Sequence, residues 1–183
     1  MFKIFTIVVF TSVFLISLSN SCSNPQPQSN TQLIVTQAIA VLHPLNRSEV
    51  HGVVTFTKVT DGIQVVADVD GLTPGEHGFH IHEYGNCDSP DGSSAGGHFN
   101  PDNKAHGGPD DMVRHVGDMG NLNADENGHA PLEYIDHLMS FEGSHNIIGR
   151  GIIIHANRDD LRSQPSGNAG PRIACGVIGI AKQ

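Results

Sequence analysis

Histidine is concentrated in the middle of this 183-residue chain, at spacings that could support metal chemistry. His80 and His82 stand two residues apart in the stretch GFHIHEYG, and strand residues i and i+2 share one face, so both imidazoles would project together. Two histidines at this spacing, without further ligands, are equally typical of hydrogen-bonded histidines at the rim of a sheet. Five further ligand-type residues favour a metal over that alternative: His98, His106, His115, Asp118 and His155.

These seven residues would supply two four-coordinate sites if one ligand is shared. Imidazole suits both copper and zinc. A set made only of ring nitrogens is compatible with tetragonal copper(II), whereas three histidines and a carboxylate suit tetrahedral zinc. The spacing alone does not divide the ligands between the two sites.

Short alternating or β-branched runs, separated by turn residues, predict the elements that must position these side chains. Glycine is frequent, at 21 residues, and tryptophan is absent, which favours short strands over a helical bundle. The pattern predicts an all-β fold, an eight-stranded antiparallel Greek-key β-sandwich or flattened barrel. The predicted strands are Ala38–Leu42, Val53–Val59, Ile63–Val69, Gly78–His82, Gly120–Ala124, Ala130–Ile135, Ile147–His155 and Ile173–Ala181.

Two long segments lack this pattern of short strands and turns, Glu83–Gly117 and Ala156–Pro171. Both are rich in Gly, Pro and Asp and poor in periodic apolar residues. Loops of this length in a compact domain are usually either functional or disordered. Because the first carries several ligand-type residues, we expect two ordered functional loops.

The N-terminus has the features of an export segment. One positive charge at Lys3 precedes the apolar run Ile4–Leu18, which is short for a membrane span, so we predict a signal peptide over residues 1–21 rather than a transmembrane anchor. Cys22 and the polar stretch after it resemble the lipid-attachment site and tether of a bacterial lipoprotein. The alternative is an ordinary signal peptide that leaves Cys22 as a free thiol. We expect a flexible tether over residues 22–32 and one domain over residues 33–183, exported as a periplasmic or cell-envelope lipoprotein or else secreted.

The charge balance argues against a nucleic-acid partner. The formal net charge is −9, and a phosphate-binding surface needs clustered Lys and Arg. Contact with a membrane is expected only through a lipid at Cys22.

Several strings, taken in order, resemble the copper,zinc superoxide dismutase family from about Leu33 to the C-terminus: GFHIHEYG, GGHFNP, HGGP, RHVGDMGN, IIGRGIIIH and GNAGPRIACGVIGIA. The resemblance implies one copper and one zinc ion per subunit. The implied copper ligands are His80, His82, His98 and His155. The implied zinc ligands are His98, His106, His115 and Asp118, with His98 as the bridge between the metals.

The same resemblance assigns roles to residues around the metals. Asp159 would join a copper histidine to a zinc histidine, His80 to His106. Cys87 and Cys175 would form the intrachain disulfide, and Arg172 would hold the anionic substrate beside copper. His77 would have a hydrogen-bonding role in a loop, and the other histidines would face solvent or turns: His43, His51, His129, His137 and His145.

The implied reaction is dismutation of superoxide to dioxygen and hydrogen peroxide by a redox-cycling copper bridged to a structural zinc, with His98 carrying a proton. The implied role is antioxidant defence outside the cytoplasm. Arg158 and Arg162 are candidates for guiding superoxide, and Ser166 for lining its channel. Ile147, Gly149 and the C-terminal GVIGIA resemble positions of a homodimer interface. The rival functions are a non-enzymatic copper-binding domain and a sandwich stabilised by zinc alone.

Overall fold

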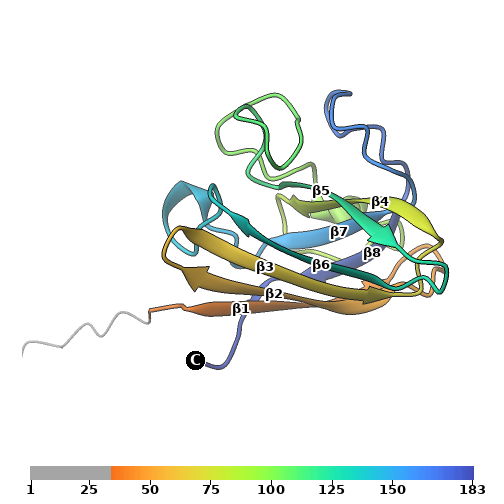
Figure 1. The fold of residues 1–183 in the computed structure, drawn as a ribbon, viewed down its shortest axis with the longest axis horizontal. Coiled ribbons are helices and arrows are strands. Elements are labelled where there is room, and N and C mark those ends of the chain that lie inside the picture. Colours follow the sequence, from red (N-terminus) through yellow and green to blue (C-terminus); the bar gives the residue numbers. More distant parts are fainter. Residues whose placement is uncertain (1–33) are drawn as a thin grey trace, which may run out of the picture. The chain divides into compact units, whose positions relative to one another are not determined.

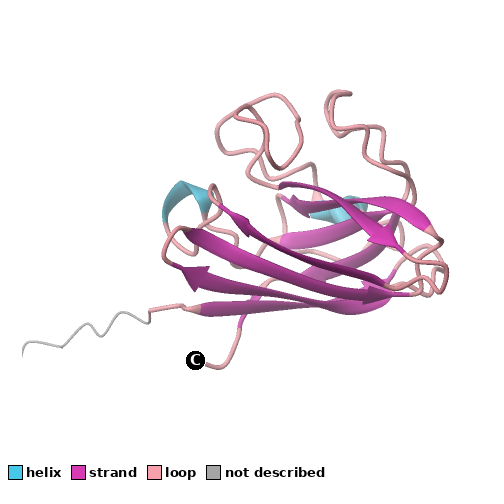
Figure 2. Cartoon of the chain, in the orientation of Figure 1, coloured by secondary structure: helices cyan, strands magenta, loops and turns pink. Residues whose placement is uncertain are grey.

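The computed structural model describes residues 34–183, so the predicted signal peptide, Cys22 and the tether lie outside the described residues. This part of the chain is almost entirely strand and loop (Figure 2). The strands are β1 (Gln37–Pro44), β2 (His51–Val59), β3 (Gly62–Asp70), β4 (Gly75–His82), β5 (Asp118–Ala124), β6 (Ala130–Asp136), β7 (Gly151–His155), β8 (Arg172–Val177) and β9 (Gly179–Ile180). Two single-turn 3₁₀ helices, η1 (Ser93–Ala95) and η2 (Gly143–His145), complete the secondary structure, and within residues 34–183 no helix could span a bilayer.

The strands form a nearly closed antiparallel barrel with the order β5-β4-β7-β8-β1-β2-β3-β6 (Figure 1). A short pairing between β1 and β8, His43 opposite Cys175 and Pro44 opposite Ala174, joins its two halves. The strands β3 and β4 follow each other in sequence but lie in different halves, as in a Greek key. This architecture confirms the predicted all-β flattened barrel.

Alternation along the strands creates the core. In β3 the buried residues Ile63, Val65, Ala67 and Val69 alternate with more exposed ones, because successive side chains point to opposite faces. Strand β7 differs, since all five of its residues are buried. Its outer face is covered as well: Ile153 packs with Leu45, Ala95 and Cys175 in a second apolar cluster outside the main core.

Two predicted strands differ most from the observed bounds. The predicted strand Ile147–His155 begins only at Gly151, because Ile148 and Gly149 form a turn in which Gly149 has a φ of 79°. The predicted strand Ile173–Ala181 divides at Ile178, whose N–H donates to the carbonyl of Arg150 rather than continuing the ladder. The two-residue strand β9 then pairs with β1.

Both long loops occupy the segments predicted for them, residues 83–117 between β4 and β5 and residues 156–171 between β7 and β8. They rise from the same side of the barrel (green and blue in Figure 1). The predicted disulfide is present between Cys87 and Cys175, which are 88 residues apart in sequence. It fastens the start of the first loop to β8.

Candidate metal centre

Adjacent strands bring three of the seven ligand-type residues together. His80 and His82 lie on β4 and are buried, and His155 is the last residue of the neighbouring strand β7. His98 comes from the first long loop, which returns to β4 and forms a bridge with His82. The i, i+2 spacing on β4 therefore places two imidazoles on the face that the returning loop covers.

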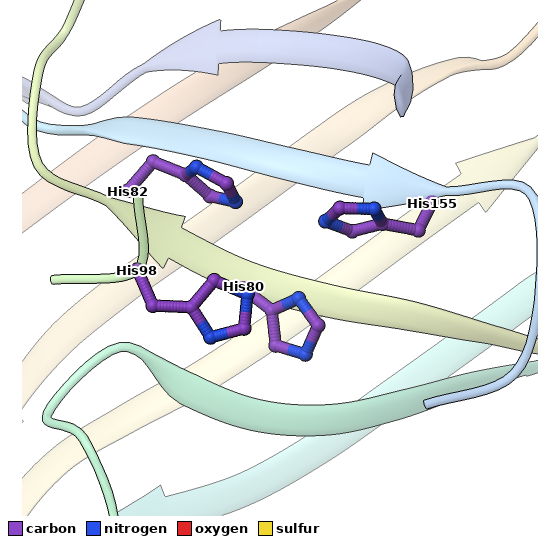
Figure 3. A group of neighbouring side chains, drawn as sticks. All are labelled: His80, His82, His98 and His155. Atoms are coloured by element: carbon purple, nitrogen blue, oxygen red, sulfur yellow. The ribbon is translucent and has the colours of Figure 1, made fainter. Parts of the chain in front are cut away.

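The first cluster consists of one ring nitrogen from each of these four histidines, all within 4.8 Å of one another (Figure 3). Each of the four nitrogens is buried and has no hydrogen-bond partner: His80 Nδ1, His82 Nε2, His98 Nε2 and His155 Nε2. Buried polar atoms are rarely left unpaired, because desolvation without a new hydrogen bond costs about 1–3 kcal/mol each. A cation bound among them would supply the missing partner, so these residues fit a metal with four nitrogen ligands.

The other nitrogen of each strand-borne ring is held by a fixed acceptor. His82 Nδ1 lies 3.0 Å from the carbonyl oxygen of Gly96, and His155 Nδ1 lies 3.0 Å from that of Gly170. His80 Nε2 lies 2.6 Å from Asp159 Oδ2. Such contacts place the proton on the held nitrogen and leave the inward nitrogen with a lone pair.

The electrostatic environment keeps the first cluster neutral. Burial, the largest cause, lowers the pKa of His80 to about 3 and that of His155 to about 4, and it also lowers the pKa values of His82 and His98. A neutral imidazole is the form that ligates metals. The rings are therefore ready to bind a metal at neutral pH.

The second cluster surrounds one carboxylate oxygen. Asp118 Oδ1 lies 2.8 Å from His98 Nδ1, 3.0 Å from His106 Nδ1 and 3.1 Å from His115 Nδ1. The other oxygen of Asp118 accepts backbone N–H groups from Gly107 and His115. Three imidazoles and one carboxylate form the donor set typical of tetrahedral zinc.

Two residues connect the clusters. His98 contributes Nδ1 to the second cluster and Nε2 to the first. Asp159 contacts both clusters, since its Oδ1 lies 3.0 Å from His106 Nε2 and its Oδ2 contacts His80. Gly167 packs against Asp159 with a φ of 65°, and a Cβ there would overlap the carboxylate, so a glycine is needed at this position.

Arg172 lies beside the first cluster. Its guanidinium donates hydrogen bonds to the carbonyls of Gly92 and Gly96 and lines a pocket of about 190 Å³. Ser166 lines the same pocket. Arg158 instead pairs with Glu76 at 2.6 Å, and its side chain is not part of the pocket lining. The complete lining is His82, Gly97, His98, His155, Pro165, Ser166 and Arg172.

The remaining histidines largely lie at the surface. His77 is the exception: it is buried in β4 rather than in a loop, where its ring contacts the carbonyl oxygens of His155 and Thr73. His145 is partly buried, with contacts to Asp102 and to the carbonyl of Leu138. His129 contacts exposed Asp70. The other three, His43, His51 and His137, are exposed.

Two amide side chains support the clusters and were not among the residues predicted from the sequence. The Asn121 side chain exchanges two hydrogen bonds with the backbone of Asp159, and the Gln164 side chain does the same with the backbone of His106. Each side-chain amide thus pairs with both the backbone N–H and the backbone C=O of one residue distant in the sequence. Neither has a sequence signal of its own, because the partners are 38 and 58 residues away.

Comparison with known proteins identifies relatives that match most of the chain. The family model "Copper/zinc superoxide dismutase" matches residues 50–178. A superoxide dismutase [Cu-Zn] of Paramecium bursaria Chlorella virus 1 is 44% identical over 85% of this chain and 86% of its own length. The extracellular superoxide dismutase [Cu-Zn] of Drosophila melanogaster is 45% identical over 87% of this chain and 93% of its own length. The crystal structure of the clock protein EA4 has a TM-score of 0.74 and 45% identity, covering 80% of this chain and 96% of that one.

Proposed function

The chain belongs to the copper/zinc superoxide dismutase family, whose members are oxidoreductases acting on superoxide, and we propose that it performs this reaction with a copper ion and a zinc ion joined through His98. The proposal assigns copper to the first cluster and zinc to the second. Two superoxide ions and two protons would give one dioxygen and one hydrogen peroxide. The observation that carries the proposal is the group of four unpartnered, buried ring nitrogens on His80, His82, His98 and His155.

Copper bound there would supply one-electron redox chemistry, taking an electron from one superoxide and giving it to another. The protein's own task is to bind and orient the anion and to deliver protons. Arg172 is always charged and presents directed donors toward the pocket, which suits a small oxyanion. Whenever Nε2 is not bound to copper, His98 would hold a proton at that nitrogen, while the contact of Nδ1 with the Asp118 cluster keeps the ring in place.

Substrate capture must overcome the overall charge. The formal net charge of −9 repels superoxide at long range, so attraction must come from local positive charge near the pocket. Arg172 supplies it together with the bound metals. We assign no guiding role to Arg158, because its charge is paired with Glu76.

The test combines metal analysis with a superoxide-consumption assay on the wild type and on His155→Ala. We expect one copper and one zinc per subunit in the wild type, rapid turnover, and loss of copper and turnover in the variant. Copper bound to the wild type without turnover of superoxide would favour a non-enzymatic copper-binding domain. Zinc without copper would favour a sandwich stabilised by zinc alone.

We also propose that the protein acts outside the cytoplasm, in antioxidant defence. Support comes from the disulfide, which persists in oxidising compartments, and from relatives named extracellular in Drosophila melanogaster and Brugia pahangi. A lipid at Cys22 and a periplasmic or cell-envelope location complete the proposal. Mass spectrometry of the native protein isolated from membranes should show a lipid on an N-terminal Cys22, and an unmodified N-terminus would contradict the lipid anchor.

A homodimer is the proposed assembly. Ile147 is fully buried within the subunit, so its side chain is not available for an interface. The apolar surface of the resembling segments falls instead on Val177 and Ile180, which are 43% and 47% exposed. Sedimentation at micromolar concentration should show a dimer, and a monomer alone would remove this part of the proposal.

A further inference from the structure

The turn between β1 and β2 (residues 45–48) contacts the backbone that carries Arg172. The side-chain amide of Asn46 donates from Nδ2 to the carbonyl oxygen of Arg172 at 2.9 Å. The hydroxyl of Ser48 donates to the carbonyl oxygen of the next residue, Ile173. Two consecutive carbonyls of β8 are therefore held by one turn.

The carbonyl oxygen of Ile173 also accepts the backbone N–H of Leu45 at 2.8 Å, and β8 is irregular at this point. Opposite β7, Ile154 faces Ala174 but His155 faces Arg172, so Ile173 is an extra residue on β8. An extra residue of this kind disrupts the ladder and re-aims a neighbouring side chain. In this structure it places Arg172 beside His155 at the pocket.

Asn46 also holds the loop that receives the guanidinium. Its backbone N–H donates to the carbonyl oxygen of Pro90 at 3.1 Å. Two residues later, the carbonyl of Gly92 accepts a hydrogen bond from the Arg172 guanidinium. The contacts form a closed ring that runs from Asn46 to the Arg172 backbone, through the guanidinium to Gly92, and back through Pro90 to Asn46.

We propose that Asn46 is a positioning residue for Arg172, fixing its backbone and one of the two carbonyls that orient its guanidinium. The proposal rests on the substrate-binding role of Arg172 proposed above. The turn demands a residue such as asparagine, because Asn46 has a φ of 52°, in the left-handed region that asparagine tolerates better than most residues. Glycine would keep this backbone and remove only the side-chain contact.

The experiment measures anion binding in the copper- and zinc-loaded protein, with azide as the probe, by visible absorption of the copper. Asn46→Gly removes the contact to the Arg172 carbonyl. Ser48→Ala is the control in the same turn: it removes the hydroxyl's hydrogen bond to the adjacent carbonyl of Ile173, which keeps the N–H of Leu45 as a partner, and the hydroxyl's contact with the N–H of Val50. Arg172→Gln tests the premise, and thermal unfolding of all three variants separates stability from positioning.

We expect Asn46→Gly to weaken azide binding and kcat/KM by about fivefold, the equivalent of one hydrogen bond. Ser48→Ala should lower Tm while leaving azide affinity at the wild-type value.

If Arg172→Gln weakens azide binding and Asn46→Gly does not, the positioning role is wrong and the proposed function stands. The same holds if Asn46→Gly and Ser48→Ala weaken azide binding equally. If Arg172→Gln has no effect, the assignment of Arg172 itself fails. Should Asn46→Gly fold poorly, Asn46→Asp, which keeps the side-chain shape and loses the donor, must weaken azide binding at high ionic strength or the inference is overturned.

Discussion

His98 Nδ1 lies 2.8 Å from Asp118 Oδ1, while Nε2 of the same ring is buried among the unpartnered nitrogens of the first cluster. One imidazole therefore belongs to two potential metal sites. With a metal at each of its two nitrogens the ring would be held from both sides, so a change in one site would be transmitted to the other through a rigid group.

Replacement of Asp159 by asparagine should weaken both metal sites. Its two oxygens contact His80 and His106, and an amide would present a donor to one ring nitrogen that already carries a proton. Loss of such a supporting carboxylate typically lowers metal affinity roughly 10- to 100-fold. Competition with a chelator, followed for copper and zinc separately, measures the effect. Asp61→Asn makes the same charge change at an exposed turn and should leave both affinities unaltered.

Gly92→Ala should impair the pocket through Arg172. A Cβ at this position would lie 2.7 Å from Leu45 Cδ1 and 3.1 Å from Arg172 Cδ. Gly143→Ala is the matched control, because Gly143 has a similar φ of 69° but a Cβ there meets nothing within 4 Å. Both variants should lose roughly 1–2 kcal/mol of stability from the left-handed backbone. Only Gly92→Ala should lower kcat/KM, on the order of tenfold, since misplaced substrate-binding groups cost rate. Equal kcat/KM values in the two variants would argue against a role for this contact.

Removal of the disulfide should destabilise the barrel and loosen the first loop. By the chain-entropy model, a bridge between residues 88 apart contributes ~4–5 kcal/mol. Urea unfolding of the Cys87→Ser/Cys175→Ser double variant, compared with the wild type, gives the change in the free energy of unfolding. A loss smaller than about 1 kcal/mol would mean that the loop is held mainly by its other contacts.

The stability of the metal-free protein should peak near pH 6.5. Burial lowers the pKa of His80 to about 3 and of His155 to about 4, so the unfolded chain takes up protons first and stability falls as pH drops below 6.5. For His106 burial acts in the same direction, but the hydrogen-bonded carboxylates Asp118 and Asp159 outweigh it and raise the pKa to about 9. The folded protein then keeps a proton that the unfolded chain loses, so stability also falls from pH 6.5 toward 9.

Thermal unfolding of the metal-free, disulfide-bonded protein between pH 5 and 9 tests this profile. His155→Gln should flatten the acid side, because it removes one of the residues that protonate only on unfolding. The alkaline side should be retained in this variant. A Tm that rises steadily toward pH 5 would contradict the assignment of neutral, buried imidazoles.

Much of the barrel could be predicted from local pattern alone. The alternation of apolar and polar residues predicts both strands of the β2–β3 hairpin. The two long loops are predicted by their lack of periodic apolar residues. The ends of β7 and β8 could not be found in this way. Ile147 and Ile148 continue an apolar run, yet a turn at Gly149 and the contact between Ile178 and Arg150 decide where pairing starts.

The site likewise has some features that follow from local sequence and others that depend on contacts between residues far apart in the chain. The shared face of His80 and His82 follows from strand geometry, whereas the ligand sets came from the resemblance to a family. The carbonyls of Gly96 and Gly170 that orient His82 and His155 have no sequence signature, because every residue carries a carbonyl. Contacts such as Asn46 with Arg172 join residues 126 apart and depend on the completed fold.

The most direct test of a two-metal site joined through His98 is a crystal structure of the copper- and zinc-loaded protein, with anomalous scattering measured at the absorption edge of each metal. We expect copper at the first cluster and zinc at the second, with Nε2 and Nδ1 of His98 each about 2.0–2.1 Å from a different metal. Both metals at one cluster, or His98 in contact with only one of them, would contradict it.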